Sequence, residues 1–150
     1  MNIVTSHQLS FSPAVLQKDG PRIFIEISAP SSDIKEGSAV GLEFPPALGI
    51  TAVIDTGASL TVVNPEVVEK CKLRATGFAI VASIEKKAQY RQHAAWIKFP
   101  NTKLKDLDGI PVVACKISQQ PYSCLIGRDI LRNWLLTYSG NGTVSIQELR

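Results

Sequence analysis

The chain has 150 residues, of which 45% are hydrophobic and 19% charged, and its formal net charge is +3. This length suits a single domain with a sizeable core, so we treat residues 1–150 as one domain. The basic residues are scattered, which argues against nucleic-acid binding. No apolar run approaches the ~20 residues that a membrane span needs, so no membrane association is expected.

The cysteines and histidines indicate the cellular compartment and whether a metal site is expected. The chain has three cysteines and two histidines, and its first residues lack the features of a secretory signal. An odd number of cysteines then favours free thiols in a reducing compartment, so a cytoplasmic location is expected. Cys115 and Cys124 either face each other across a hairpin or are small buried apolar residues. The spacing of these residues fits no metal site, and no metal is expected.

The first third of the chain predicts one clear strand and a long connection. Residues 1–20 are expected to form a loosely ordered N-terminal extension. The stretch Arg22–Ser28 places isoleucines at alternate positions, which is typical of a strand with one buried face. Residues 29–49 are rich in proline, serine and glycine and predict a long connection with a short strand at 39–44.

The remaining elements are predicted to be mostly strands. Asn64 and Pro65 are typical of a helix start and predict a short helix over residues 65–73. Strands are expected at 50–55, 59–63, 110–117 and 143–149, and two more within 77–99, joined by a polar tip near 85–88. Residues 125–138 are expected to begin as a strand and to become a helix after Gly127, with an apolar stripe that includes Trp134 and Leu135. Many short strands with two short helices predict a small β-barrel or sandwich.

One acidic residue stands at an unusual place in the stretch AVIDTGASLTVV, residues 52–63. Asp55 directly follows the apolar residues of a predicted strand, and burying an unpaired charge costs several kcal/mol. It is therefore either the first residue of a surface turn or a carboxyl group that the protein needs in a semi-buried place. Asp-Thr-Gly alone is weak evidence, because Asp and Gly are ordinary turn residues. The strands on both sides, however, place the acid at the end of two packed strands.

A second stretch, LIGRDIL at residues 125–131, places two apolar residues and a glycine before a helix with an acid in its first turn. With both stretches in this order, the sequence resembles the retropepsin-like aspartic proteases, which include the retroviral proteases and single-domain bacterial relatives. A weaker resemblance extends over residues 22–146. It implies a mainly β, retropepsin-like acid protease fold, a small closed β-barrel with one or two short helices.

The resemblance implies an aspartic endopeptidase that works as a homodimer on a peptide or protein substrate. Each chain of such a dimer supplies one Asp-Thr-Gly, and this chain has one. Two Asp55 carboxyl groups about 3 Å apart would share one proton and activate a water molecule. This mechanism requires no covalent intermediate, metal or cofactor. The implied flap, which closes over the peptide, is the hairpin at residues 79–96.

The resemblance also implies roles for the residues of the two motifs. Thr56 is expected to form a hydrogen bond across the dimer axis, and Gly57 to offer its backbone to the substrate. The implied catalytic residue is Asp55; the loop is supported by Thr56, Gly57 and Ala58; the substrate contacts Gly57, Ser59, Ile84 and Ile126; and Leu125, Ile126, Gly127, Arg128 and Asp129 pack beneath the loop.

Two departures from the family pattern keep a second function open. Retroviral members often have an acid at the place of Ser59, where it pairs with the arginine that matches Arg128. Without that acid, Arg128 is expected to contact Asp129 or a backbone carbonyl, or to be a plain exposed helix residue. The presumed flap tip SIEKKAQ also contains no glycine. The alternative is a catalytically silent retropepsin-fold module that serves in dimerisation or peptide binding.

Overall fold

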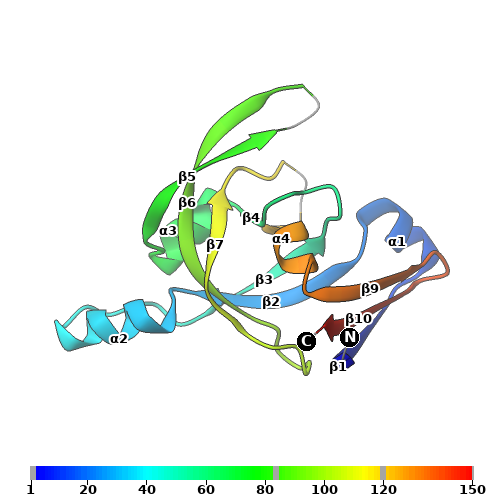
Figure 1. Ribbon diagram of the computed structural model, residues 1–150, viewed down its shortest axis with the longest axis horizontal. Coiled ribbons are helices and arrows are strands. Elements are labelled where there is room, and N and C mark those ends of the chain that lie inside the picture. The colour runs from blue at the N-terminus through cyan, green and yellow to red at the C-terminus, as the bar shows by residue number, and fades with distance from the viewer. Residues whose placement is uncertain (1–2, 83–84, 119–120, 150) are drawn as a thin grey trace.

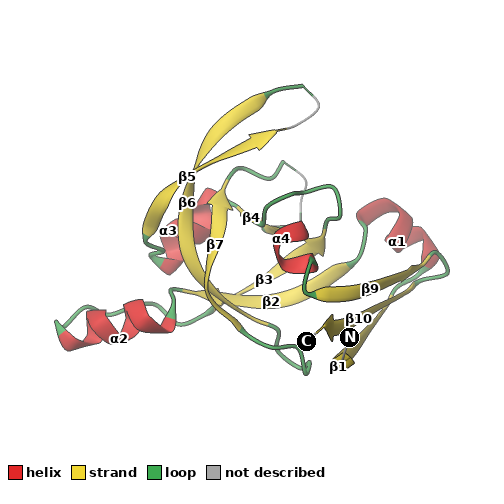
Figure 2. Cartoon of the chain, in the orientation of Figure 1, coloured by secondary structure: helices red, strands yellow, loops and turns green. Residues whose placement is uncertain are grey.

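The computed structural model describes residues 3–82, 85–118 and 121–149, and within them the chain forms ten strands and four short helices (Figures 1 and 2). The strands are β1 (Ile3–Ser10), β2 (Arg22–Ser28), β3 (Leu48–Ile54), β4 (Val62–Val63), β5 (Ala75–Ala82), β6 (Lys87–Lys98), β7 (Leu107–Ala114), β8 (Cys124–Ile126), β9 (Trp134–Ser139) and β10 (Thr143–Leu149). The helices are α1 (Pro13–Asp19), α2 (Ser31–Ala39), α3 (Pro65–Cys71) and α4 (Arg128–Leu131).

The larger sheet closes on itself. Its strand order is β2-β3-β8-β4-β7-β6-β5, and β2 also pairs with β6. Six strands therefore form a closed ring, and only β5 lies outside it as an edge strand. The expected mainly β architecture is confirmed, and closure leaves the ring without exposed edges, which limits edge-to-edge association.

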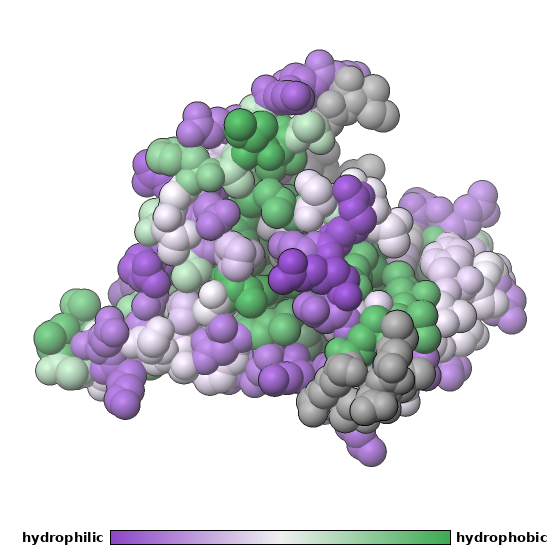
Figure 3. All heavy atoms as spheres, viewed as in Figure 1, coloured by the Kyte–Doolittle hydropathy of each residue, from purple (hydrophilic) through white to green (hydrophobic). Residues whose placement is uncertain are grey.

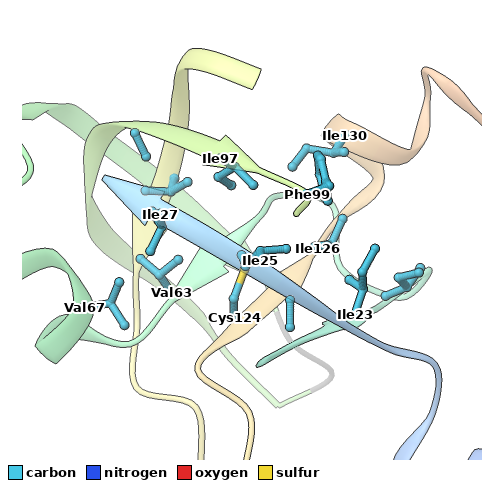
Figure 4. Close-up of a cluster of buried hydrophobic side chains, with 14 of the residues drawn as sticks. Ile23, Ile25, Ile27, Val63, Val67, Ile97, Phe99, Cys124, Ile126 and Ile130 are labelled. Atoms are coloured by element: carbon cyan, nitrogen blue, oxygen red, sulfur yellow. The ribbon is translucent and has the colours of Figure 1, made fainter. Parts of the chain in front are cut away.

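The core lies inside this ring and is built largely from aliphatic side chains (Figure 4). Ile23, Ile25 and Ile27 point inward from β2, as the alternation of a half-buried strand predicts. Ile25 and Ile27 are fully buried. They pack with Ile97 of β6 and with Ile126 of β8, so the strands that carry the two sequence motifs belong to the same core.

A smaller sheet corrects the expectation of a loosely ordered N-terminal extension. It has the order β1-β10-β9, with His7 paired to Ile146 in an antiparallel register. Helix α1 follows, and its N-cap Ser12 accepts a 3.2 Å hydrogen bond from the backbone N–H of Val15. The described part of this segment is ordered because β10 supplies backbone partners that lie at the other end of the sequence.

Helix α2 replaces the long connection expected between β2 and β3. Residues 31–39 are helical, and residues 40–47 form no strand. Pro30 occupies the N-cap position, and Asp33 lies in the first turn, where a negative charge favours the helix dipole. The backbone N–H of Ser31 donates to Asp108 at 3.0 Å, which ties the start of α2 to β7. The residues after its end include the exposed apolar side chains Val40 and Leu42, and Figure 3 shows apolar surface at the far left, where α2 lies in Figure 1.

The helix expected after Gly127 is much shorter than the apolar stripe predicted. Helix α4 ends at Leu131, and β9 begins at Trp134. Trp134 is the register partner of Glu148 in β10, and its ring meets that of Phe99 edge-on at 5.4 Å between centroids. Pairing with β10 and this aromatic contact override the local helical pattern. None of the helices in the described part of the chain is long and apolar enough to cross a membrane.

Candidate active site

Asp55 begins the turn that follows β3. Its backbone N–H donates to the carbonyl oxygen of Ile126 at 2.9 Å, so the turn starts against β8. Its carbonyl oxygen accepts from Ala58 at 3.2 Å, which closes the turn. Its carboxylate accepts a 2.8 Å hydrogen bond from the backbone N–H of Gly57. The side chain is partly buried, which is the semi-buried placement that one of the two interpretations of this acid required.

Strand β8 lies between the strands that lead into and out of the Asp55 turn. It runs parallel to β3, with Ile54 opposite Ile126, and antiparallel to β4, with Val62 opposite Leu125. Ile126 is completely buried in the core, so the expected contact between Ile126 and substrate does not fit the structure. Alternation along β8 instead exposes the neighbouring Leu125 to the cavity that contains Asp55.

Gly127 allows the chain to pass directly beneath the Asp55 turn. A Cβ atom at this position would lie 2.5 Å from the backbone carbonyl carbon of Leu60 and 2.6 Å from its oxygen. No real Cβ tolerates such a contact, so glycine is needed here for space. The backbone angles of Gly127, φ −91° and ψ −179°, are open to any residue.

Arg128, the first residue of α4, braces the Asp55 turn. The guanidinium Nη1 of Arg128 donates to the backbone carbonyl oxygen of Thr56 at 2.7 Å, and the Arg128 N–H donates to Ala58 at 2.8 Å. Of the three expectations for Arg128, the backbone-carbonyl contact is the one observed. Ser59 is exposed and lines the cavity.

Thr61 is a structural residue of the site that sequence reasoning missed. It is fully buried, and its hydroxyl donates to a carboxylate oxygen of Asp129 at 2.8 Å. Its backbone N–H donates to the other carboxylate oxygen at 3.0 Å, and its hydroxyl oxygen accepts from the Gly127 N–H at 3.1 Å. The signal in the sequence was a hydroxyl residue directly before the buried pair Val62 and Val63.

The Asp55 carboxyl group opens into a cavity of about 600 Å³. Gly57 and Ser59, two of the expected substrate contacts, line it, whereas Ile84 lies outside the described residues. The inner face of the β5–β6 hairpin covers one side, and Figure 3 shows this hairpin projecting from the body of the molecule. The apolar side chains in the wall include Val53, Leu60, Val62, Val81, Ile117 and Leu125.

Two of the three cysteines are buried and offer no competing nucleophile in this site. All three are free, and Cys71 and Cys124 are buried. Burial first, and the nearby charge of Asp129 second, raise the pKa of the Cys124 thiol to about 12, so this thiol stays protonated. Cys115 is partly exposed and lines the cavity. Among the described residues, no group of three or more His, Cys, Asp or Glu side chains is arranged to hold a metal ion.

A second hollow of about 530 Å³ lies near the C-terminal end of β10. Two of its carboxylates are already engaged by the fold: Asp108 accepts from the N–H and the hydroxyl of Ser31, and Glu148 accepts from the backbone N–H of Lys105. These bonds hold α2 and the segment before β7 in place. The Asp55 cavity is therefore the better candidate for chemistry.

Comparison with known proteins gives a family and a fold. The sequence model of a family described as retroviral aspartyl protease matches residues 18–138. The structure is similar to a retropepsin-like aspartic protease from Rickettsia conorii, with 13% identity and a TM-score of 0.52, over 99% of this chain and 95% of that one. It is also similar to EIAV protease complexed with the inhibitor HBY-793, with 16% identity and a TM-score of 0.49, over 75% and 85% of the two chains. A search of curated proteins finds no match.

Proposed function

Because the chain belongs to the retroviral aspartyl protease family, we propose that it is an aspartic endopeptidase whose catalytic dyad forms from the Asp55 residues of two copies. One observation carries the proposal: a partly buried carboxylate, oriented by the Gly57 N–H at 2.8 Å, opens into a cavity of peptide-binding size. The turn that holds it is fixed from below by β8 and α4. Such preorganisation is what a catalytic group requires.

The proposed dyad follows from the single Asp-Thr-Gly of the chain. Two carboxyl groups about 3 Å apart cannot both ionise, so the pair holds one proton. The ionised carboxylate takes a proton from a water molecule, whose oxygen attacks the scissile carbonyl carbon, while the protonated carboxyl donates to the developing oxyanion. Full ionisation removes the acid and full protonation removes the base, so the rate follows a bell on the acidic side of neutral.

The residues around Asp55 have supporting roles in this scheme. Thr56 is exposed in the single chain, as is expected of a residue that forms a hydrogen bond across a dimer axis. Gly57 presents its backbone in the cavity to an extended peptide, and Ala58 closes the turn. The β5–β6 hairpin is the proposed flap, and Val81 on its inner face contributes to the cavity wall.

The second candidate is a catalytically silent module for dimerisation or peptide binding. The absence of glycine from the tip SIEKKAQ favours it, because a stiffer tip would close less freely over a substrate. This candidate predicts that peptides bind in the cavity and dissociate uncleaved. It is separated from the first candidate by measuring binding and cleavage on the same peptides.

The test is cleavage of a diverse peptide mixture at acidic pH, followed by mass spectrometry, with purified wild-type protein and Asp55→Asn. Asparagine keeps an oxygen that accepts from the Gly57 N–H but cannot serve as the base, so cleavage should be lost while the unfolding transition stays in place. Asp106→Asn, at an exposed position outside the cavity, is the matched control. Equal cleavage by wild type and Asp55→Asn would refute the assignment.

A further inference from the structure

The C-terminal end of α1 forms part of the wall of the Asp55 cavity, with Lys18, Asp19 and Gly20 in its lining. This helix end is held from two sides. The buried Tyr122 hydroxyl donates to the carbonyl oxygen of Asp19 at 2.6 Å, and the Ile54 N–H donates to that of Pro21 at 2.9 Å. The helix end therefore fixes the backbone of Lys18, an exposed residue of the cavity lining.

A second lysine reaches the same cavity from the segment after β7. Lys116 is exposed, and both of its neighbours are anchored. The Cys115 N–H donates to Val63 at 3.0 Å, and the Ile117 N–H donates to the side-chain oxygen of Asn64 at 2.7 Å. Ile117 is buried, so the alternation of the extended chain directs Lys116 outward to the cavity lining.

These two lysines bring two positive charges to the lining of the cleft. Neither of them forms an ion pair in the part of the chain that the structure describes. The acids in the described lining are Asp19 and Asp55, of which Asp55 belongs to the proposed chemistry. The pKa of the Tyr122 hydroxyl is raised by burial and then by the charge of Asp19, and Arg22 opposes this shift. Arg22 therefore acts on this hydroxyl with the sign opposite to that of Asp19, and no acid of the described lining forms an ion pair with either lysine.

From this arrangement we propose that the cleft selects peptides that carry an acidic side chain flanking the scissile bond, with Lys18 and Lys116 as the groups that recognise it. The inference rests on the proposed function. The apolar wall formed by Val53, Val81 and Leu125 surrounds the approach to Asp55 and accepts apolar side chains next to the bond that is cut. A two-fold dimer presents each lysine twice, so an acid on either side of that bond finds an ammonium partner.

The experiment uses the best-cleaved peptide from the mixture above. It is acetylated at its N-terminus and amidated at its C-terminus, so that only the side chain at the varied position supplies a carboxylate. Glutamate, glutamine and lysine are placed in turn at each position from four residues before the bond to four after it. The variants are Lys18→Glu and Lys116→Glu, and the control is Lys35→Glu on α2, an exposed lysine outside the cavity. A free C-terminal acid in place of the amide tests whether a terminal carboxylate serves equally well.

We expect wild type to favour glutamate over glutamine at one or more flanking positions by about two- to fivefold in kcat/KM for each lysine engaged, mostly through KM. The preference should weaken at high salt as charge is screened. Lys18→Glu or Lys116→Glu should remove the preference for glutamate or reverse it in favour of lysine. Lys35→Glu should leave the preference unchanged. A terminal acid that restores the full effect without a side-chain acid would overturn the assignment to side chains.

Binding measurements separate failure of the inference from failure of the proposed function. Fluorescence anisotropy with Asp55→Asn and the same peptides reports affinity without turnover. If wild type cleaves no peptide of the mixture, the series is built instead on the peptide that Asp55→Asn binds most tightly. Tighter binding of its glutamate versions than of its glutamine versions then means that the protease proposal fails and the charge selection holds. Equal affinity and equal cleavage at every flanking position, or no binding at all, would overturn the inference.

Discussion

The guanidinium of Arg128 donates a 2.7 Å hydrogen bond to the backbone carbonyl oxygen of Thr56, the residue next to the catalytic candidate Asp55. It joins the first turn of α4 to the turn after β3. The acid that often pairs with this arginine in retroviral members is replaced here by Ser59, which is exposed. A backbone acceptor therefore takes the place of a carboxylate, and the brace does not depend on an ion pair.

Replacing Arg128 by glutamine should loosen the Asp55 turn. The bond is charge-assisted but exposed, so we expect a loss of about 1 kcal/mol in the free energy of unfolding and a larger proportional loss in kcat, because the geometry of the dyad depends on Thr56. Arg132→Gln, at the exposed C-cap of the same helix, is the control. Urea unfolding and peptide cleavage are the measurements. Equal kcat for the two variants would contradict a bracing role.

Thr61 should be more sensitive to loss of its hydroxyl than an exposed threonine. Thr61→Val keeps the shape but removes the 2.8 Å bond to Asp129 and the acceptor for the Gly127 N–H. A buried N–H without a partner costs about 1–3 kcal/mol, which is the destabilisation expected in urea unfolding. Thr61→Ser should restore most of it, and Thr137→Val at an exposed site of β9 should change little. Equal effects of the two valine substitutions would exclude this network.

Gly127→Ala should destabilise the protein through contact rather than backbone strain. The added Cβ would meet the backbone of Leu60 at 2.5 Å, and the two packed backbone segments have little room to separate. We expect a loss of about 1–3 kcal/mol in the free energy of unfolding. Gly140→Ala, where an added Cβ meets nothing within 4 Å, is the control. If both alanine substitutions lower the free energy of unfolding equally, the close contact inferred at Gly127 is wrong.

His93 should make the stability fall in mild acid. It is buried on β6 near the base of the flap, and burial first and Arg91 second lower its pKa below the usual 6.5. The unfolded chain therefore binds this proton before the folded one does. Stability is full above about pH 6.5 and declines as the pH falls toward the folded pKa. His93→Gln should reduce the slope of the unfolding free energy as the pH falls below about 6.5; an unchanged slope would count against this role of His93.

The strands with one buried face were predictable because the pattern that defines them is local. Isoleucines at alternate positions of Arg22–Ser28 indicate β2 without any knowledge of its partners. Strand β9 was not predictable in this way, because its apolar residues have helical spacing. Pairing with the following strand β10 and the contact of Trp134 with Phe99, which is remote in the sequence, override that pattern. Helix α2 was missed because its serines and glycine are typical of loops.

The residues of the candidate site also fall into those that a local sequence pattern reveals and those that it does not. Asp55 and the glycines stand out in the sequence because a charge after an apolar strand and a glycine before a helix are local signals. The partners of Arg128 and Thr61 depend on how closely β3, β4 and β8 pack, and no local pattern encodes a distance between strands. Such contacts become predictable only once the strand order is known.

The last prediction concerns assembly. One Asp-Thr-Gly gives half of the proposed dyad, so specific activity should fall when the protein is diluted below its dimer dissociation constant. Two copies joined by a flexible linker should keep their activity on dilution, because the linker holds the effective concentration near millimolar.

Adding Asp55→Asn to wild type should lower the cleavage rate for each wild-type chain. The reason is that mixed dimers carry one carboxyl and lack either the acid or the base. The expected specific activity per total protein follows the fraction of wild-type dimers, about one quarter at an equal mixture if the chains exchange freely. Cleavage in the mixture and across the dilution series, measured beside sedimentation, gives both results. Constant specific activity at concentrations where sedimentation finds monomers would show that a single chain carries the whole site.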